Sequence, residues 1–313
     1  MATQSLSFRL ASTLTGGRTR GQVRRAFWVY AFATPWILGL LIFTVGPILA
    51  SLYFGFTDYN IIKPAKWVGL ANYQRALFKD DLFWPSMGRT FYFALVTVPL
   101  ETIASLLCAM LLNQNLRGKS IFRTLFFLPS LTPAPALAIL WAWILHPQMG
   151  PVNTMLGYLG LPKPLWMAAP ATAIPSLILI SLWAAAGGNR MLIFLAGLQG
   201  VPEELYDASR IDGAGRWATL SSVTLPMISP TILFNVVLGV IGALKVFTLA
   251  FVATKGGPAY ATWFIALHIY SQAFQYFRMG YGAALAWLFA IMLLVFTVIQ
   301  LKLSDRWVYY AGQ

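Results

Sequence analysis

The chain has 313 residues, of which 58% are hydrophobic and only 10% charged, and its formal net charge is +13. A soluble globular protein needs far more charge on its surface, so this composition excludes that class and predicts a membrane protein. The excess of lysine and arginine does not indicate nucleic-acid binding, because no basic helix or aromatic RNA-binding motif accompanies it. In a membrane protein the same excess indicates orientation and contact with anionic membrane lipid.

The N-terminal part joins a basic tail to a long apolar stretch. Residues 1–26 carry five arginines and no acidic residue. The apolar stretch at 27–54 is too long for a signal peptide and lacks a convincing cleavage site, so we expect a retained first transmembrane helix. Residues 55–87 follow as a polar external loop, and the aromatic residues in it suit the membrane interface.

Five further apolar stretches follow, each long enough to cross a hydrocarbon core of about 30 Å. We expect a bend in the third span, because it contains Pro129, Pro133 and Pro135. The predicted fold is an all-α, polytopic membrane protein with six transmembrane helices, a core at 88–302 and a C-terminal tail at 303–313. The five later spans are predicted at 88–113, 122–145, 170–197, 223–252 and 279–302.

The distribution of basic residues predicts which side of the membrane each loop occupies. With the N-terminus inside, the internal segments hold twelve lysines and arginines and the external segments hold eight. The first tail usually dominates orientation, and it is the most basic segment. We therefore expect both termini, and the loop at 198–222, to lie in the cytoplasm.

A polar segment at 202–226 interrupts the apolar pattern between the fourth and fifth spans. Pro202 suits the start of a helix, and Glu203 and Glu204 suit its first turn, where the helix dipole favours negative charge. Gly213 can end that helix with a positive φ angle, and a second short helix is expected at 216–222. The pattern indicates a helical hairpin that docks a soluble partner; the alternative is an ordinary charged loop.

This segment resembles the cytoplasmic loop of permease subunits of binding-protein-dependent ABC importers. The pattern of that family is Glu-Ala-Ala, three residues, Gly, nine residues, then Ile-x-Leu-Pro. The present chain has Asp207-Ala208-Ser209, Gly213 and Val223-Thr224-Leu225-Pro226 at the same spacings. It differs in having Asp for Glu, Ser for Ala and Val for Ile. Because Asp207 is one methylene shorter, its reach to a partner is open.

Three loop sequences narrow the resemblance to the carbohydrate-importing branch of the family. VGLANYQRALF at 68–78, GPVNTMLGYLGL at 150–161 and KGGPAYAT at 255–262 resemble the external loops of that branch. The resemblance covers most of residues 27–302. It implies the type I importer permease fold and a place in the cell membrane of a prokaryote.

The same resemblance implies a set of partners. It predicts a second homologous permease subunit, two ATP-binding subunits that carry ATP and Mg, and an external solute-binding protein. This chain would bind no cofactor and would line, with the second permease, the path of a sugar or oligosaccharide. Alternatives are the same fold importing glycerol phosphate or another small polar solute, or a secondary transporter or membrane scaffold. Internal repeats would indicate a secondary transporter, and none is apparent.

The resemblance also assigns roles to particular residues. A coupling helix at 203–212 would lie in a groove on one ATPase subunit, and helical spacing places Glu203, Asp207 and Arg210 on one stripe. The residues predicted to couple to the ATPase are Glu203, Glu204, Asp207, Ala208, Arg210, Asp212 and Gly213.

Charged residues within the spans mark a second candidate site. Glu101 lies in the second span and Lys245 in the fifth, and a lone charge at the bilayer centre costs about 2.5–3.5 kcal/mol on insertion scales. Each is expected to face protein or a water-filled space, as a pair, as ligands for substrate hydroxyls, or, for Glu101, as a satisfied structural carboxylate. Lys245 could instead snorkel. Arg190 is either a further candidate for contacts with the sugar or a residue that snorkels, and snorkelling is the simpler account.

The predicted substrate path combines these charges with aromatic and amide side chains, which suit sugar rings and hydroxyls. The family often carries Asp immediately after the position of Phe247, whereas this chain has Thr248. The carboxylate that the family often places in the substrate path is therefore not expected at this position. The path residues predicted are Glu101, Trp183, Asn189, Asn235, Lys245 and Phe247.

No catalytic or metal site is predicted, so the chain is not expected to be an enzyme. It has no glycine-rich phosphate loop that ends in Lys-Ser or Lys-Thr. His146 and His268 are far apart in the sequence and lack neighbouring metal ligands, so interfacial polar packing is the expected role of both. Cys108, the single cysteine, can form no intrachain disulfide and is expected to be a packing residue.

Overall fold

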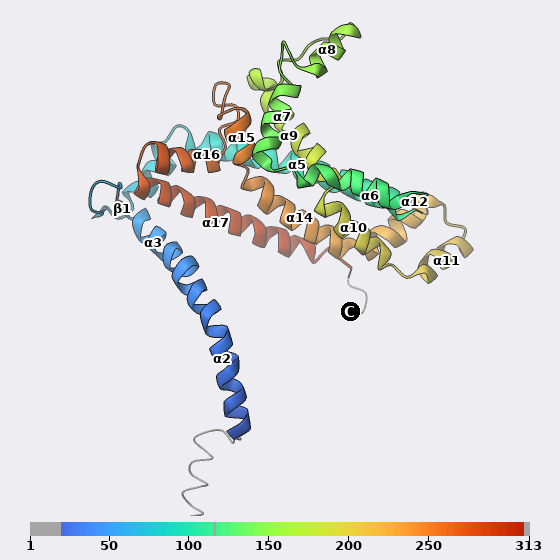
Figure 1. Ribbon diagram of the computed structural model, residues 1–313, viewed down its shortest axis with the longest axis horizontal. Helices are drawn as coiled ribbons and strands as arrows, with labels where there is room; N and C mark the ends of the chain where they lie inside the picture. Colours follow the sequence, from blue (N-terminus) through green and yellow to red (C-terminus); the bar gives the residue numbers. More distant parts are fainter. Residues whose placement is uncertain (1–19, 115–116, 310–313) are drawn as a thin grey trace, which may run out of the picture. The chain divides into compact units, whose positions relative to one another are not determined.

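The computed structural model describes residues 20–114 and 117–309, and at 20–24 and 26 it describes the backbone alone. The basic residues of the predicted tail at 1–19 and the end of the C-terminal tail at 310–313 lie outside the described residues. The chain divides into two compact units, Met1–Phe54 and Gly55–Gln313. Helices dominate both units (Figure 1).

The first unit is a helical rod. Helix α2 (Arg20–Leu40) continues through a π-helical turn η1 (Leu41–Val45) into α3 (Gly46–Gly55). The stretch Phe27–Gly55 is long and apolar enough to span a membrane, and none of its most apolar window is buried within the chain. Large side chains such as Phe32 and Phe43 are exposed along it. Such a surface suits lipid or the apolar face of another helix.

The second unit begins with a short segment that contains two strands and a helix, where the sequence pattern predicted only a polar loop. Strands β1 (Thr57–Asp58) and β2 (Lys66–Trp67) pair antiparallel, with Thr57 opposite Trp67. Helix α4 (Ala71–Phe78) follows. The long helix α5 (Phe83–Asn113) then begins five residues before the predicted second span. Just before it, Asp80 forms a local turn, in which its Oδ1 accepts a hydrogen bond from the Leu82 backbone N–H at 2.9 Å.

Two of the predicted spans are bent pairs of helices. Helix α6 (Lys119–Phe127) and the short 3-10 helix η2 (Leu128–Leu131) meet α7 (Ala134–Ile144) at 95°. The prolines of this stretch predicted that bend, which is therefore confirmed. Helix α9 (Pro170–Ala186) meets α10 (Asn189–Gln199) at 45°. This second bend lies at Gly187–Gly188. The absence of a side chain at Gly187 lets the Phe126 backbone approach closely, because a Cβ there would overlap it.

The remaining elements complete the second unit. Between the bent pairs lie α8 (Pro151–Tyr158) and the short 3-10 helix η3 (Trp166–Ala168). After the polar hairpin come α14 (Ser229–Leu244), α15 (Thr248–Ala253), α16 (Ile265–Tyr270), the π-helical turn η5 (Ser271–Gln275) and α17 (Met279–Ser304). Within the described residues, four helical stretches are long and apolar enough to span a membrane, or up to six if each bent pair is one span. The all-α polytopic fold is thus established, and six spans are compatible with it.

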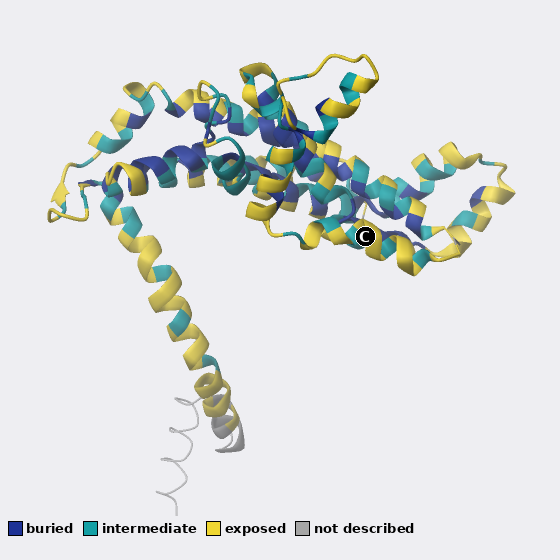
Figure 2. Ribbon diagram, turned by 45° about the horizontal axis from the view of Figure 1, so that its top comes forward, coloured by how far each residue is buried: buried dark blue, intermediate teal, exposed yellow. Residues whose placement is uncertain are grey.

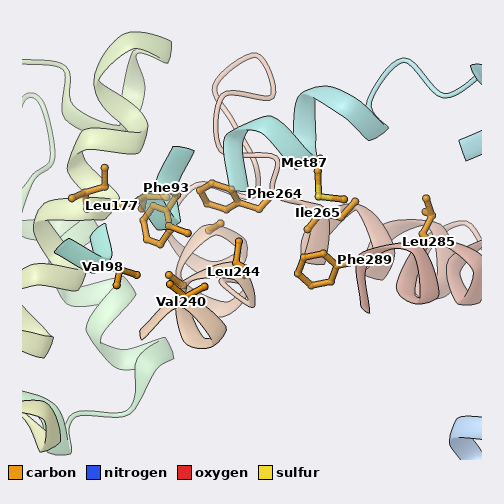
Figure 3. Close-up of a cluster of buried hydrophobic side chains, with 14 of the residues drawn as sticks. Met87, Phe93, Val98, Leu177, Val240, Leu244, Phe264, Ile265, Leu285 and Phe289 are labelled. Atoms are coloured by element: carbon orange, nitrogen blue, oxygen red, sulfur yellow. The ribbon is translucent and has the colours of Figure 1, made fainter. Parts of the chain in front are cut away.

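Two apolar clusters hold the second unit together. The larger gathers around α5, α9, α14 and α17, and includes Phe93, Leu177, Val240 and Phe289 (Figure 3). The smaller packs one end of α5 against α10 and includes Leu112, Phe194 and Ile228. Exposed residues line much of the ribbon outside these clusters (Figure 2). Many of them are large and apolar, as expected for helices that contact lipid or partner subunits.

Candidate functional site

The polar segment folds as an ordered hairpin. Helix α11 (Glu203–Ile211) carries Glu203 and Glu204 in its first turn. It ends where Gly213 adopts a φ of 75°. The Ala214 N–H donates to the Ser209 carbonyl at 3.0 Å and the Gly213 N–H donates to the Arg210 carbonyl at 3.1 Å. These two bonds form a Schellman motif, so Gly213 ends the helix as the sequence pattern predicted.

The returning arm is longer than predicted. Helix α12 (Arg216–Thr219) continues through a π-helical turn η4 (Leu220–Thr224) into α13 (Leu225–Met227), whereas the sequence pattern ended the second helix at Ser222. The prediction of that end was wrong, because the polar residues Ser221 and Ser222 are tolerated within the helical arm.

The two arms are tied to each other and to the transmembrane helices. The Ser209 and Thr219 hydroxyls are 2.7 Å apart and hydrogen-bonded. The Thr224 hydroxyl donates to the Tyr206 phenol at 3.4 Å. Tyr206 and Val223 also pack against the smaller apolar cluster, which joins α5 to α10. The hairpin is therefore an extension of the helical core rather than a loose charged loop.

The charged side chains of α11 point into solvent. Glu203, Glu204, Asp207 and Asp212 are all exposed. Arg210 Nη1 lies 3.1 Å from Asp207 Oδ1, with side chains that are 78% and 66% exposed. Such an exposed i,i+3 pair contributes only about 0.2–0.5 kcal/mol, so both groups are free to exchange partners. A cleft of about 410 Å³, lined in part by Glu203, Asp207 and Arg210, lies beside the helix.

Two apolar side chains at the tip of the hairpin were missed by the sequence reasoning. Ile211 is 85% exposed at the end of α11, and Trp217 is 83% exposed at the start of α12. Ala208, which was predicted, is exposed on the same helix. The signal was present in the sequence, since an isoleucine and a tryptophan stand on either side of the glycines that end the first helix of the hairpin. Exposed large apolar groups in a rigid polar frame are typical of docking surfaces.

The charge in the second span has a partner. Glu101 Oε2 on α5 lies 2.7 Å from Arg190 Nη1 on α10, and the two side chains are 8% and 19% exposed. The Arg190 guanidinium also lies against Gly239 of α14, where a Cβ would come within 2.9 Å of Nη2. The sequence-based account of Arg190 as a snorkelling residue was wrong. Its position near a helix end did not reveal the acid on another helix.

The other predicted path residues occupy different environments. Asn235 is fully buried, and its Nδ2 donates to the Thr231 carbonyl at 3.0 Å. Asn189 is exposed at the first residue of α10. Trp183 is half-exposed and meets Trp141 edge to face, with ring centroids 5.5 Å apart. The three residues lie on α14, α10 and α9 respectively.

Lys245 and Phe247 lie at a break in the fifth span. Helix α14 ends at Leu244 and α15 begins at Thr248. Lys245 is exposed and does not pair with Glu101. Phe247 stacks on Phe251, with ring centroids 5.2 Å apart. Tyr270 contacts both rings, and Phe274 extends the group from η5.

A buried polar cluster links the segment before α5 to α16 and α17. His268 Nε2 lies 2.9 Å from Asp80 Oδ2, and the Tyr281 hydroxyl donates to the same oxygen. Because the Trp263 indole N–H donates to His268 Nδ1 at 3.1 Å, Nε2 must carry the hydrogen that faces Asp80. Burial would raise the pKa of Asp80, but the hydrogen bonds from His268 and Tyr281 outweigh it and hold the pKa below its ordinary value.

This cluster assigns His268 a different place from the interfacial packing that the sequence suggested, because the ring is fully buried. His146 keeps a local role, since its Nδ1 accepts from the Met149 backbone N–H at 3.2 Å. Within 20–114 and 117–309, no three His, Cys, Asp or Glu side chains gather closely enough to hold a metal ion.

The helical architecture, the bent spans and the ordered polar hairpin together define a polytopic transport protein of the membrane. Residues 101–309 match the model of the family described as binding-protein-dependent transport system inner membrane component. The chain belongs to this family, and it is therefore a permease subunit of an ABC importer.

Known relatives match nearly the whole chain. A probable ABC transporter permease, YesP of Bacillus subtilis, is 40% identical over 91% of this chain and 92% of its own length. The trehalose/maltose permease MalF of Thermococcus litoralis is 33% identical over 90% and 95%. The lactose permease LacF of Rhizobium radiobacter is 32% identical over 90% and 96%.

A solved structure shares the fold. It is that of a bacterial ABC transporter involved in the import of the acidic polysaccharide alginate. The match has a TM-score of 0.81 and 25% identity, and it covers 91% of this chain and 97% of the other.

Proposed function

We propose that this chain and a second permease subunit form the path of a sugar or oligosaccharide delivered by an external binding protein. Two separate ATP-binding subunits, which carry ATP and Mg, supply the energy. The family description supports the dependence on a binding protein. The names of the trehalose/maltose and lactose relatives support a carbohydrate as the solute.

The hairpin from α11 to α13 is the proposed coupling surface. The observation that carries this role is the packing of the hairpin against the smaller apolar cluster of α5 and α10. Through this cluster, a movement imposed on the hairpin reaches both helices. Glu203, Glu204, Asp207, Arg210 and Asp212 supply exposed charges for charge-assisted hydrogen bonds to an ATPase groove.

Ile211 and Trp217 add apolar anchors to this charged surface. Anchors of this kind contribute more to binding than rim charges, and truncation of such a residue typically costs at least about 2 kcal/mol. The missing methylene of Asp207 is then less important than in a surface that depends on a single carboxylate.

The coupling role is tested with the purified importer in lipid nanodiscs. Ile211→Ala and Trp217→Ala should each lower ATPase subunit retention, and the ATP hydrolysis stimulated by the binding protein, by at least about tenfold. Ile62→Ala is the matched control, since Ile62 is 88% exposed but lies between β1 and β2. Retention and hydrolysis unchanged by Ile211→Arg would contradict the proposal.

The proposed orientation places the hairpin and both termini in the cytoplasm of a prokaryotic cell, with the β1–β2 segment outside. The basic N-terminal tail supports it. In a Cys108→Ser background, a membrane-impermeant maleimide applied to whole cells should label Ile62→Cys and leave Ile211→Cys unlabelled until the cells are opened. The reverse pattern would overturn the orientation.

A further inference from the structure

Lys245 places an uncompensated positive charge within the membrane. It lies about 24 Å of helix beyond Ser229 and eight residues before Ala253, the two ends of a stretch long and apolar enough to span a membrane, so it falls inside a hydrocarbon core of about 30 Å. Glu101 is the one acidic residue in the sequence of the predicted spans, and it pairs with Arg190. In the part of the chain that the structure describes, no carboxylate lies within ion-pair distance of Lys245.

The backbone at Lys245 gives a second, independent indication of polar surroundings. The stretch between α14 and α15 is not helical, and Phe247 has φ −136° and ψ −62°. Irregular backbone at membrane depth is tolerated only where it is buried in protein or lines a water-filled space, because lipid cannot satisfy its hydrogen bonds. Lys245 itself is exposed on this chain. Its ammonium group therefore faces an aqueous path or a partner subunit rather than lipid.

Phe247, two residues after Lys245 in the sequence, belongs to a cluster of aromatic rings. Phe247, Phe251 and Tyr270 contact one another with ring centroids 5.1–5.3 Å apart. Phe274 continues the cluster, with its ring 5.5 Å from that of Tyr270. Aromatic walls with a few placed polar groups are typical of small-molecule sites, and they offer flat faces to sugar rings.

We infer that the solute of this importer is a carbohydrate that bears a negative charge, and that Lys245 binds this charge on its way through the membrane. The inference rests on the proposed carbohydrate function and specifies its substrate class. A carboxylate on a sugar ring gains a charge-assisted hydrogen bond from the ammonium group while the ring lies against the aromatic cluster. A neutral sugar would leave the charge of Lys245 uncompensated. A phosphate ester could also pair with the ammonium group, so the test below includes one as a separate probe.

The test uses the complete importer in proteoliposomes with its binding protein. The three probes are a hexuronate trisaccharide, its carboxyl-reduced neutral counterpart, and glycerol 3-phosphate. We expect the binding protein to bind the hexuronate probe. Lys245→Gln should then lower hexuronate uptake relative to wild type by about tenfold or more, as loss of a charge-assisted bond requires. Lys245→Arg should retain most of the uptake, and Lys302→Gln is the control, since Lys302 is an exposed lysine at the end of α17.

Each other outcome decides the question. A binding protein that takes the neutral probe and rejects both anions overturns the inference while leaving the proposed function intact. A binding protein that prefers glycerol 3-phosphate shows an anionic solute that is not a carbohydrate. This result overturns both the inference and the proposed carbohydrate function. Unchanged hexuronate uptake by Lys245→Gln shows that Lys245 is oriented towards lipid headgroups and rejects its role. Loss of assembly with the second permease on Lys245→Gln assigns the lysine to a subunit contact instead, which also rejects it.

Discussion

The Glu101–Arg190 pair offers a quantitative test of how this chain holds charge inside a membrane. Glu101→Met removes the carboxylate and leaves a guanidinium that is 19% exposed and cannot lose its proton. Breaking a buried pair in this way costs about 3–5 kcal/mol, and the partial exposure of Arg190 places the expected cost near 3 kcal/mol. Arg190→Met should cost less, about 1–3 kcal/mol, because a carboxyl group can become neutral.

The double variant separates the pair from its surroundings. Replacing both residues with methionine removes both charges, so its stability should return close to that of the wild type. With single costs of about 3 and about 1–3 kcal/mol and little cost for the double variant, the coupling energy is expected at about 4–6 kcal/mol, above the usual range for residues in contact. Free energies of unfolding are measured by titrating SDS into the protein in mixed micelles. The exposed pair of Asp207 and Arg210 is the control, with coupling of at most about 0.5 kcal/mol.

Additive effects at Glu101 and Arg190 would refute this reasoning. A coupling energy below about 0.5 kcal/mol would mean that the two side chains do not share one environment. A double variant as unstable as Glu101→Met would point to lost packing of the long side chains rather than to charge.

Local geometry leads to four further predictions. Gly213→Ala should destabilise the hairpin by about 1–2 kcal/mol, because φ is positive there, whereas Gly215→Ala should be neutral in a thermal scan of the importer. Asp80→Asn should lower the thermal midpoint by a constant amount above about pH 5, and the difference from wild type should narrow below pH 4. The pKa of Asp80 is depressed in the fold, so its stabilisation is lost only as the carboxylate takes up a proton. His268→Gln, which keeps an N–H donor, should retain more of that stability than His268→Leu, measured in the same scan. Gly187→Ala should separate α9 from α6 and lower uptake; uptake unchanged from wild type would contradict the close approach.

Local rules predicted the elements whose causes lie within a few residues. Pro202, the two glutamates and Gly213 describe α11 almost to the residue, because caps and helix dipoles act within one turn. The apolar stretches predicted the long helices for a similarly local reason. A segment in lipid must form its backbone hydrogen bonds within itself, which a helix does. Helix α4 was missed because its polar residues carry no membrane signal.

Contacts between distant residues could not be predicted in this way. Asp80 and His268 are 188 residues apart in the sequence, and only packing of α16 beside α5 brings them together. The partner of Glu101 was likewise hidden, since Arg190 lies on a different helix near a bend that no proline announced. The sequence therefore indicated that a charge within a span needs a partner or water, but it did not identify Arg190 as the partner of Glu101.

The position of α10 connects these observations. At its start, Arg190 ties α10 to α5 through Glu101. At its end, Leu198 packs in the apolar cluster that also holds Tyr206 of the hairpin. Helix α10 is thus held at its start by α5 and at its end by the cluster that holds the hairpin, whereas its junction with α9 is the pair Gly187–Gly188, whose backbone has the widest choice of φ and ψ angles. Under the proposed coupling role, a force on α11 therefore moves α10 as one piece, and the bend between α9 and α10 is where the displacement is absorbed.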